Sequence, residues 1–246
     1  MQYSFDIVGD VAVFETRERG NDRKIAGEII SRHKSVRSVF RKTGERKGRY
    51  RLRKLKRITG KGGKTVHREH GYLLSMDLEK VYFSSRESTE RQRIAEQARP
   101  GEKVLVMFSG VEPYSIAIAK KKPEIGKIYG VEINPAAEEF ALENIRVNKL
   151  SHKIVHITGD VRKVPLPGKF DRVVMPLPEG GKDFLNVAFR ECRKGGTIHF
   201  YSISGEEDFR DAENHLKGYR YKLLSRRKVL PYSPGRWKVC LEIRKL

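Results

Sequence analysis

The amino-acid sequence predicts an α/β protein, with a Rossmann-like, doubly wound and mostly parallel sheet preceded by a smaller basic α+β domain. Three observations support this prediction. Beyond residue 100, short apolar runs that suit strands alternate with segments of helical periodicity. Within 103–119 an apolar run breaks at Ser109-Gly110, passes Pro113 and continues as an apolar helical segment, which is typical of the strand–turn–helix entry to a βαβ unit. Before residue 79 the pattern is one of short strands with one helix and many basic residues.

The composition indicates a nucleic-acid partner. The chain has 246 residues, 38% of them hydrophobic, and a formal net charge of +21. That length allows a substantial core and two modest domains. A one-signed charge excess repels itself unless it meets a polyanion, so nucleic acid is the predicted partner and a membrane surface the alternative. No transmembrane-length apolar run, signal peptide or basic amphipathic helix is apparent, so we expect a cytoplasmic protein that binds no membrane.

The two cysteines fit the same compartment. Cys192 and Cys240 are too few for a disulfide framework, and we expect both to be reduced and buried.

The first part of the chain is predicted as a basic α+β domain over 1–78, followed by a linker helix region over 79–99. A strand over 4–14 is interrupted by a turn or bulge at Gly9-Asp10. An amphipathic helix follows and begins from an Asn or Asp cap. The remaining predicted elements are strands at Val36–Phe40, within 48–60, around Val66 and at Tyr72–Leu78, and a helix at Thr89–Arg99 that stops before Pro100.

The stretch from Arg41 to Lys64 is the most basic part of the molecule, with twelve Lys or Arg residues against one acid, Glu45. Its segment GRYRLRKLKRITG alternates, so a strand could pack Tyr50 and Leu52 inward and present Arg49, Arg51 and Arg53 outward as a row of guanidinium groups. Planar guanidinium groups bind phosphate through two parallel hydrogen bonds. The one-signed excess favours nucleic-acid binding over a solvated edge strand whose charges deter aggregation.

The second part, 100–246, is predicted to be the Rossmann-like domain. A helix begins at Asn134-Pro135, with glutamates in its first turn that favour the helix dipole. The other predicted elements are strands at Val104–Phe108, Lys127–Val131, Lys153–Thr158, Asp171–Met175 and Gly196–Ser202, helices at Asp183–Cys192 and Asp208–Lys217, and a closing antiparallel pair at Lys222–Leu230 and Trp237–Ile243.

Ligands of such sheets bind outside the carboxyl ends of the strands. Here the strand ends carry Gly110, Glu132, Asp160 and the Pro176–Pro178 segment. An acid some twenty residues beyond the glycine turn is the position at which a carboxylate holds ribose hydroxyls. The turn is not GxGxxG, which disfavours a dinucleotide. A single-glycine turn with a strand-end acid fits S-adenosyl-L-methionine better.

At this point the chain resembles a known family, the archaeal and eukaryotic tRNA guanine-37 N1-methyltransferases, and the related aminocarboxypropyltransferases of wybutosine synthesis that share their core. The resemblance runs from about Phe5 to the C-terminus. It is carried by an ordered series of motifs: SFDIVGDVAVFE, TVHREHGYLLSMDLEKVYFSSRESTERQRIAE, MFSGVEPYSIAIAK, VEINPAAEEFALENIRVNK, GDVR, DRVVMPLP and PYSPGRWKV. It implies a class I S-adenosylmethionine-dependent methyltransferase domain. It also implies a shortened form of the family, without a further N-terminal domain that touches the tRNA elbow.

The resemblance implies roles for individual residues. Glu96 is the candidate base that removes the guanine N1 proton, and Arg51 or Arg53 the partner of O6; an ordinary surface ion pair is the alternative for Glu96. For the cofactor, the resemblance implies that Tyr114 and Pro178 line the pocket of the methyl donor, that Glu132 holds the ribose and that Asp160 binds the adenine amino group. The other implied residues of the cofactor pocket are Phe108, Gly110, Asn134 and Pro176. The residues implied to bind the tRNA are Arg49, Arg51, Arg53 and Arg86.

Three departures from the family pattern keep alternatives open. Val106 replaces the acid of the first strand, Glu112 the second glycine of the turn, and Pro176 the Asn of an Asn-Leu-Pro motif. The Leu-Pro after Pro176 favours methyl transfer over aminocarboxypropyl transfer. A catalytically decayed RNA-binding module is the second alternative, and a DNA-binding protein is less favoured because no recognition helix is apparent. His67 and His70 have no partner cysteine, so we expect no metal. We expect a monomer.

Overall fold

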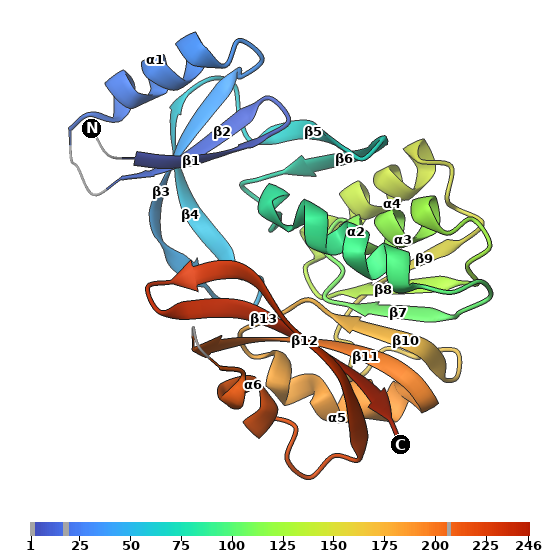
Figure 1. Ribbon diagram of the computed structural model, residues 1–246. Helices are drawn as coiled ribbons and strands as arrows, with labels where there is room; N and C mark the ends of the chain where they lie inside the picture. Colours follow the sequence, from blue (N-terminus) through green and yellow to red (C-terminus); the bar gives the residue numbers. More distant parts are fainter. Residues whose placement is uncertain (1–2, 17–19, 206–207) are drawn as a thin grey trace.

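The computed structural model describes residues 3–16, 20–205 and 208–246, which form two sheets joined by a small hairpin (Figure 1). The first part contains β1 (Tyr3–Val8), β2 (Val11–Thr16), α1 (Asp22–Arg32), β3 (Ser38–Lys47), β4 (Leu52–Thr59), β5 (Lys64–Glu69) and β6 (Tyr72–Asp77). A connecting segment contains the 3-10 turn η1 (Ser85–Glu87) and α2 (Ser88–Gln97). The second part contains β7 (Val104–Met107), α3 (Pro113–Lys121), β8 (Ile128–Glu132), η2 (Pro135–Ala137), α4 (Glu138–Val147), β9 (Ile154–Thr158), β10 (Phe170–Met175), η3 (Gly181–Phe184), α5 (Leu185–Glu191), β11 (Cys192–Gly205), α6 (Arg210–Asn214), β12 (Tyr221–Ser233) and β13 (Arg236–Lys245).

The first sheet has the order β1-β2-β3-β4, with β2 and β3 parallel and the other pairs antiparallel. The parallel pair needs a crossover, which α1 provides. The apolar face of α1 covers the sheet, where Ile25 and Ile29 pack in one core with Phe14 and Val39. The predicted break at Gly9-Asp10 is the turn between β1 and β2.

The second sheet has the order β12-β13-β11-β10-β7-β8-β9. The strands β11, β10, β7, β8 and β9 are parallel, and the closing pair β12–β13 is antiparallel, as the sequence predicts. Alternate residues of the buried strand β7 enter two different cores. Val104 and Val106 lie in the core beneath α2, α3 and α4, whereas Leu105 and Met107 lie in the core beneath α5 and α6. The sheet is therefore covered on both faces, which confirms the Rossmann-like prediction (Figure 1).

The β5–β6 hairpin connects the two parts. The outer edge of β5 bonds to the β1–β2 turn, because Asp10 N donates to Thr65 Oγ1 at 3.1 Å. The outer edge of β6 faces α4. There Asn144 accepts from Ser75 N (2.6 Å) and donates to Ser75 O (2.9 Å), and Asn148 does the same with Leu73 at 3.1 and 2.7 Å. The buried side chains of β6 share a core with the second part, although the sequence pattern places β6 in a separate domain over 1–78.

Three predicted elements differ from the structure. The strand expected at Val36–Phe40 extends further and spans Ser38–Lys47. The strand expected within 48–60 begins only at Leu52, because residues 48–51 form a turn in which Arg51 adopts a left-handed φ of 52°. Arg49 and Arg51 therefore do not extend a row along a strand face, as the alternation suggests. The helix expected at Asp208–Lys217 is shorter, Arg210–Asn214.

Candidate active site

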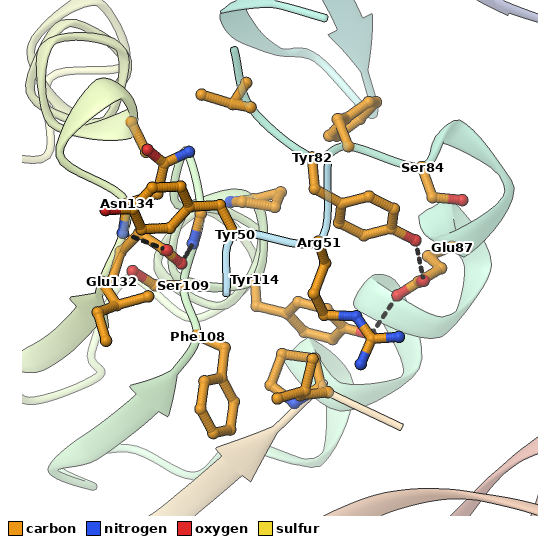
Figure 2. Close-up of a pocket in the computed structure, with 18 of the residues that line it drawn as sticks. Tyr50, Arg51, Tyr82, Ser84, Glu87, Phe108, Ser109, Tyr114, Glu132 and Asn134 are labelled. Atoms are coloured by element: carbon orange, nitrogen blue, oxygen red, sulfur yellow. Dashed lines mark hydrogen bonds between the residues drawn. The ribbon is translucent and has the colours of Figure 1, made fainter. Parts of the chain in front are cut away.

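A cavity opens at the carboxyl ends of β7 and β8, where the ligand of a doubly wound sheet is expected (Figure 2). Most of the residues predicted from the sequence for the cofactor meet there. The structure places the following predicted residues on the wall of the cavity: Phe108, Gly110, Tyr114, Glu132, Asn134, Pro176 and Pro178, together with Arg49 and Arg51 from the 48–51 turn. The first part of the chain thus contributes to a cavity built mainly by the second.

Glu132 is the polar centre of the cavity. Its Oε2 accepts a hydrogen bond from Gly110 N at 2.9 Å, and its Oε1 accepts one from Asn134 N at 2.8 Å. Burial raises the pKa of Glu132 above its ordinary value, although these backbone bonds oppose the shift. Each carboxylate oxygen keeps a further lone pair, so the group can accept two hydroxyl hydrogens.

The loops on either side of Glu132 leave space above it. Gly110 has a φ of 55°, which favours glycine, and a Cβ there would meet nothing closer than Tyr82 O at 3.8 Å. Asn134 fixes the other loop, because its side chain accepts from Ala136 N (3.1 Å) and donates to Lys80 O (2.9 Å). An open glycine turn facing a two-acceptor carboxylate fits an adenosine-bearing ligand with a vicinal diol.

Two of the departures from the family pattern leave the cavity intact. Glu112 has a left-handed φ of 68°, the conformation that a glycine would supply, and its side chain points beneath the turn. There it lies 2.6 Å from His156 Nδ1, accepts from Ser109 Oγ at 2.8 Å and also bonds to Ser115. Val106 is fully buried in the core. The third departure, Pro176, is on the cavity wall.

A groove adjoins the cavity and is lined by residues of β1, β2, β4, the 81–87 segment and the β12–β13 hairpin. We call it the neighbouring groove. Three of the arginines predicted to bind tRNA line it, Arg51, Arg53 and Arg86. Each has an acidic neighbour: Arg51 pairs with Glu179, Arg53 with Glu15 at 3.0 Å and Arg86 with Asp6.

Two predicted site residues line neither the cavity nor the neighbouring groove. Asp160 lies beside the cavity, bonded to Arg162 and 3.1 Å from Arg49 Nη2, and the Arg162 hydrogen bond is the largest of the effects that lower its pKa to about 2. Glu96 is the second of these residues, and its role as the base stays a prediction. It is exposed on α2, 3.2 Å from Lys121 Nζ, and lines neither the cavity nor the neighbouring groove. Its position is that of the surface ion pair that the sequence also allows.

Sequence reasoning missed a buried ion pair where the cavity meets the neighbouring groove. Glu87 lines both spaces, and its Oε2 lies 2.8 Å from Lys238 Nζ. Tyr114 OH donates to the same carboxylate at 3.3 Å, and Tyr82 OH at 3.5 Å (Figure 2). No local signal could have found this pair, because its two members come from η1 and β13.

The described residues hold neither a metal-binding cluster nor a membrane-spanning helix. Within 3–16, 20–205 and 208–246, no group of three or more His, Cys, Asp or Glu side chains is arranged to hold a metal ion. In the same ranges, no helix is both long and apolar enough to cross a membrane.

Comparison with known proteins identifies close relatives. A model of the TRM5/TYW2 methyltransferase domain matches residues 65–224, and a model of the TYW2 N-terminal domain matches residues 1–63. The chain is 36% identical to tRNA (guanine(37)-N(1))-methyltransferase Trm5b of Pyrococcus abyssi, over 98% of this chain and 74% of the relative. It is 31% identical to the tRNA(Phe) (4-demethylwyosine(37)-C(7)) aminocarboxypropyltransferase of Methanocaldococcus jannaschii, over 98% of both chains. A solved complex of aTrm5 and tRNALeu superimposes with a TM-score of 0.89 and 37% identity, covering 99% of this chain and 72% of that one.

Proposed function

Because the chain belongs to the TRM5/TYW2 methyltransferase family, we propose that it transfers a methyl group from S-adenosyl-L-methionine to N1 of guanine 37 in tRNA. Membership of this family makes it an S-adenosylmethionine-dependent, tRNA-modifying transferase. The observation that carries the finer proposal is the junction of the two spaces. The Glu132 cavity, which suits the donor, opens directly onto the neighbouring groove, which can admit a base.

The residues of the cavity wall position the donor. Bound S-adenosylmethionine supplies an electrophilic methyl group on its sulfonium. Glu132 accepts the ribose hydroxyls, and the Gly110 turn allows close approach of the ligand to the backbone. Pro176 and Pro178 provide a stiff apolar wall that excludes water beside the reacting atoms. Asp160, although it is bonded to arginines, remains the proposed partner of the adenine amino group.

The neighbouring groove positions the base. Extruding a base from the anticodon stack costs a few kcal/mol, which hydrogen bonds and stacking in the groove partly recover. Arg53 and Arg86 would bind the backbone there, with Arg49 beside the cavity. Arg51 lines both spaces, so its guanidinium can stabilise the negative charge that gathers on O6 as the N1 proton passes to water in the open groove.

A single experiment tests the proposal. The protein is incubated with labelled donor and a tRNA transcript carrying G37, and in parallel with the A37 transcript. Digestion and mass analysis of the product should show one methyl group on G37 and none on A37. Unmodified G37 tRNA, or methylation elsewhere, would contradict the proposal.

Aminocarboxypropyl transfer is the second candidate. It is favoured by the match over 98% of both chains to a relative named for that activity, and by the TYW2-type model over residues 1–63. The product separates the two, because the aminocarboxypropyl adduct is much heavier than a methyl group. A catalytically decayed RNA-binding protein would bind no donor. We propose in addition a cytoplasmic monomer without a metal.

A further inference from the structure

The ion pair between Glu87 and Lys238 is buried and lies beside open space. Their side chains are 8% and 5% exposed, and Glu87 lies on the wall of both the cavity and the neighbouring groove. Removing two charges from water costs several kcal/mol per ion, and their attraction rarely returns more than that. Stability is therefore a poor explanation for the pair, and a ligand that the carboxylate binds is a better one.

The two oxygens of Glu87 are not equally engaged. Oε2 receives the Lys238 ammonium at 2.8 Å and Tyr114 OH at 3.3 Å, whereas Oε1 receives Tyr82 OH at 3.5 Å, near the limit of a hydrogen bond. An ionised carboxylate has about four lone-pair sites and no donor. Glu87 thus keeps acceptor capacity where the cavity meets the neighbouring groove, beside the hydrogen bonds from Tyr82 and Tyr114 (Figure 2).

The surroundings keep this carboxylate charged. Burial acts to raise the pKa of Glu87, but the Lys238 ammonium and then Arg91 outweigh it, so the pKa lies below its ordinary value. At neutral pH the group can only accept hydrogen bonds. Among the edges that a base can present, it therefore favours one that offers N–H donors.

We propose that Glu87 reads the Watson–Crick edge of the target base by accepting the N1–H and N2–H groups of guanine, with Lys238 as the positioning residue that holds the carboxylate. This inference rests on the proposed function and names the group that selects its substrate. Adenine presents an unprotonated N1, whose lone pair would face the carboxylate. A tricyclic base closed over N1 and N2 has no N1–H to offer. Glu87 thus favours unmodified guanine over such bases.

The test compares transcripts that differ only at position 37, carrying guanosine or inosine, which lacks the N2 amino group. The variants are Glu87→Gln, Lys238→Met and the double variant, which leaves no unpaired buried charge if a single change impairs folding. Glu143→Gln, on the exposed face of α4, is the matched control. Melting curves and calorimetry of donor binding establish that each variant is folded. Single-turnover rate constants and equilibrium tRNA affinities are then measured.

For the wild type we expect guanosine to exceed inosine by about tenfold to a hundredfold, the effect of one hydrogen bond to a charged acceptor. Glu87→Gln and the double variant should lower this ratio at least fivefold when both transcripts are compared at saturating donor. Lys238→Met should lower it less, because the carboxylate remains. A wild-type ratio retained in folded Glu87 variants would overturn the assignment while leaving methylation of G37 intact. If the wild type fails to methylate G37, the proposed function fails, and the affinity ratio still decides whether Glu87 reads the edge.

Discussion

The Glu132→Ala substitution is the most direct test of the cavity. The side chain accepts two backbone hydrogen bonds, from Gly110 N and Asn134 N, and faces the space proposed for the ribose. A hydrogen bond to a charged group contributes about 1.5–3 kcal/mol. Losing one ribose bond should therefore weaken donor binding by about 10- to 150-fold, and losing both should weaken it further. The freed backbone groups would also let both loops relax.

Titration calorimetry with S-adenosylmethionine measures this effect, with Glu132→Gln as the isosteric control. The amide keeps one acceptor but places an NH2 group against a backbone N–H, so we expect an intermediate affinity. Thermal melting checks that the fold survives. An unchanged dissociation constant for Glu132→Ala would refute the placement of the donor at this carboxylate.

The Glu132 carboxyl group should also make the affinity for S-adenosylmethionine depend on pH. The pKa of Glu132 is raised by burial, and only the ionised form accepts hydroxyl hydrogens at both oxygens. Donor affinity should fall as the pH drops through this raised pKa, and Glu132→Gln should flatten that part of the profile. The free energy of unfolding should change in the opposite direction. Because the pKa of Glu132 is higher in the folded protein than in the unfolded chain, its ionisation destabilises the fold at higher pH, and this destabilisation disappears as the pH falls.

Three further predictions address the rest of the site. Glu96→Gln should change the single-turnover rate by less than about fivefold, because Glu96 lines neither space and the exposed ion pair that it loses contributes at most about 1 kcal/mol; a loss of tenfold or more would support Glu96 as the base. Neutralising Arg51 and Arg53 together should weaken tRNA binding and flatten its salt dependence, by about one unit of slope for each phosphate that the variant no longer binds, and an unchanged slope would remove both from the RNA surface. Glu112→Ala should destabilise the protein in urea more than Glu112→Gly, by about 1 kcal/mol, because only glycine relieves the left-handed backbone; equal losses would mean that the conformation is not strained.

The cofactor cavity was predictable because it follows from topology. In a parallel sheet the carboxyl ends of neighbouring strands meet at one edge, so Gly110 and Glu132 could be brought together from their positions after two apolar runs. The apolar cores on the two faces of the seven-stranded sheet could be predicted from the alternation of strands and helices and from helical periodicity. Both signals are local in the sequence.

The missed features depend on contacts between distant residues. Alternation around Arg51 favours a continuous strand, but the 48–51 turn brings Arg49 and Arg51 to the cavity instead of along a strand face. Glu87 is a charged residue in a short segment and would ordinarily be exposed; Lys238, from the last strand, supplies the opposite charge beside it in the interior. The base role of Glu96 came from the family resemblance, and its contact with Lys121 joins two helices, so neither segment alone could indicate it.

The two asparagines of α4 have a consequence for how the molecule could be divided. Each carboxamide gives the backbone of β6 one hydrogen-bond donor and one acceptor, which a neighbouring strand would otherwise supply. These side chains therefore satisfy the backbone groups along the free edge of β6. The other strand of the hairpin, β5, bonds to the β1–β2 turn of the first sheet. The hairpin therefore fixes the position of the first sheet, which carries Arg53, relative to the Glu132 cavity. A cut on either side of it would bare a strand edge prone to pairing with other chains.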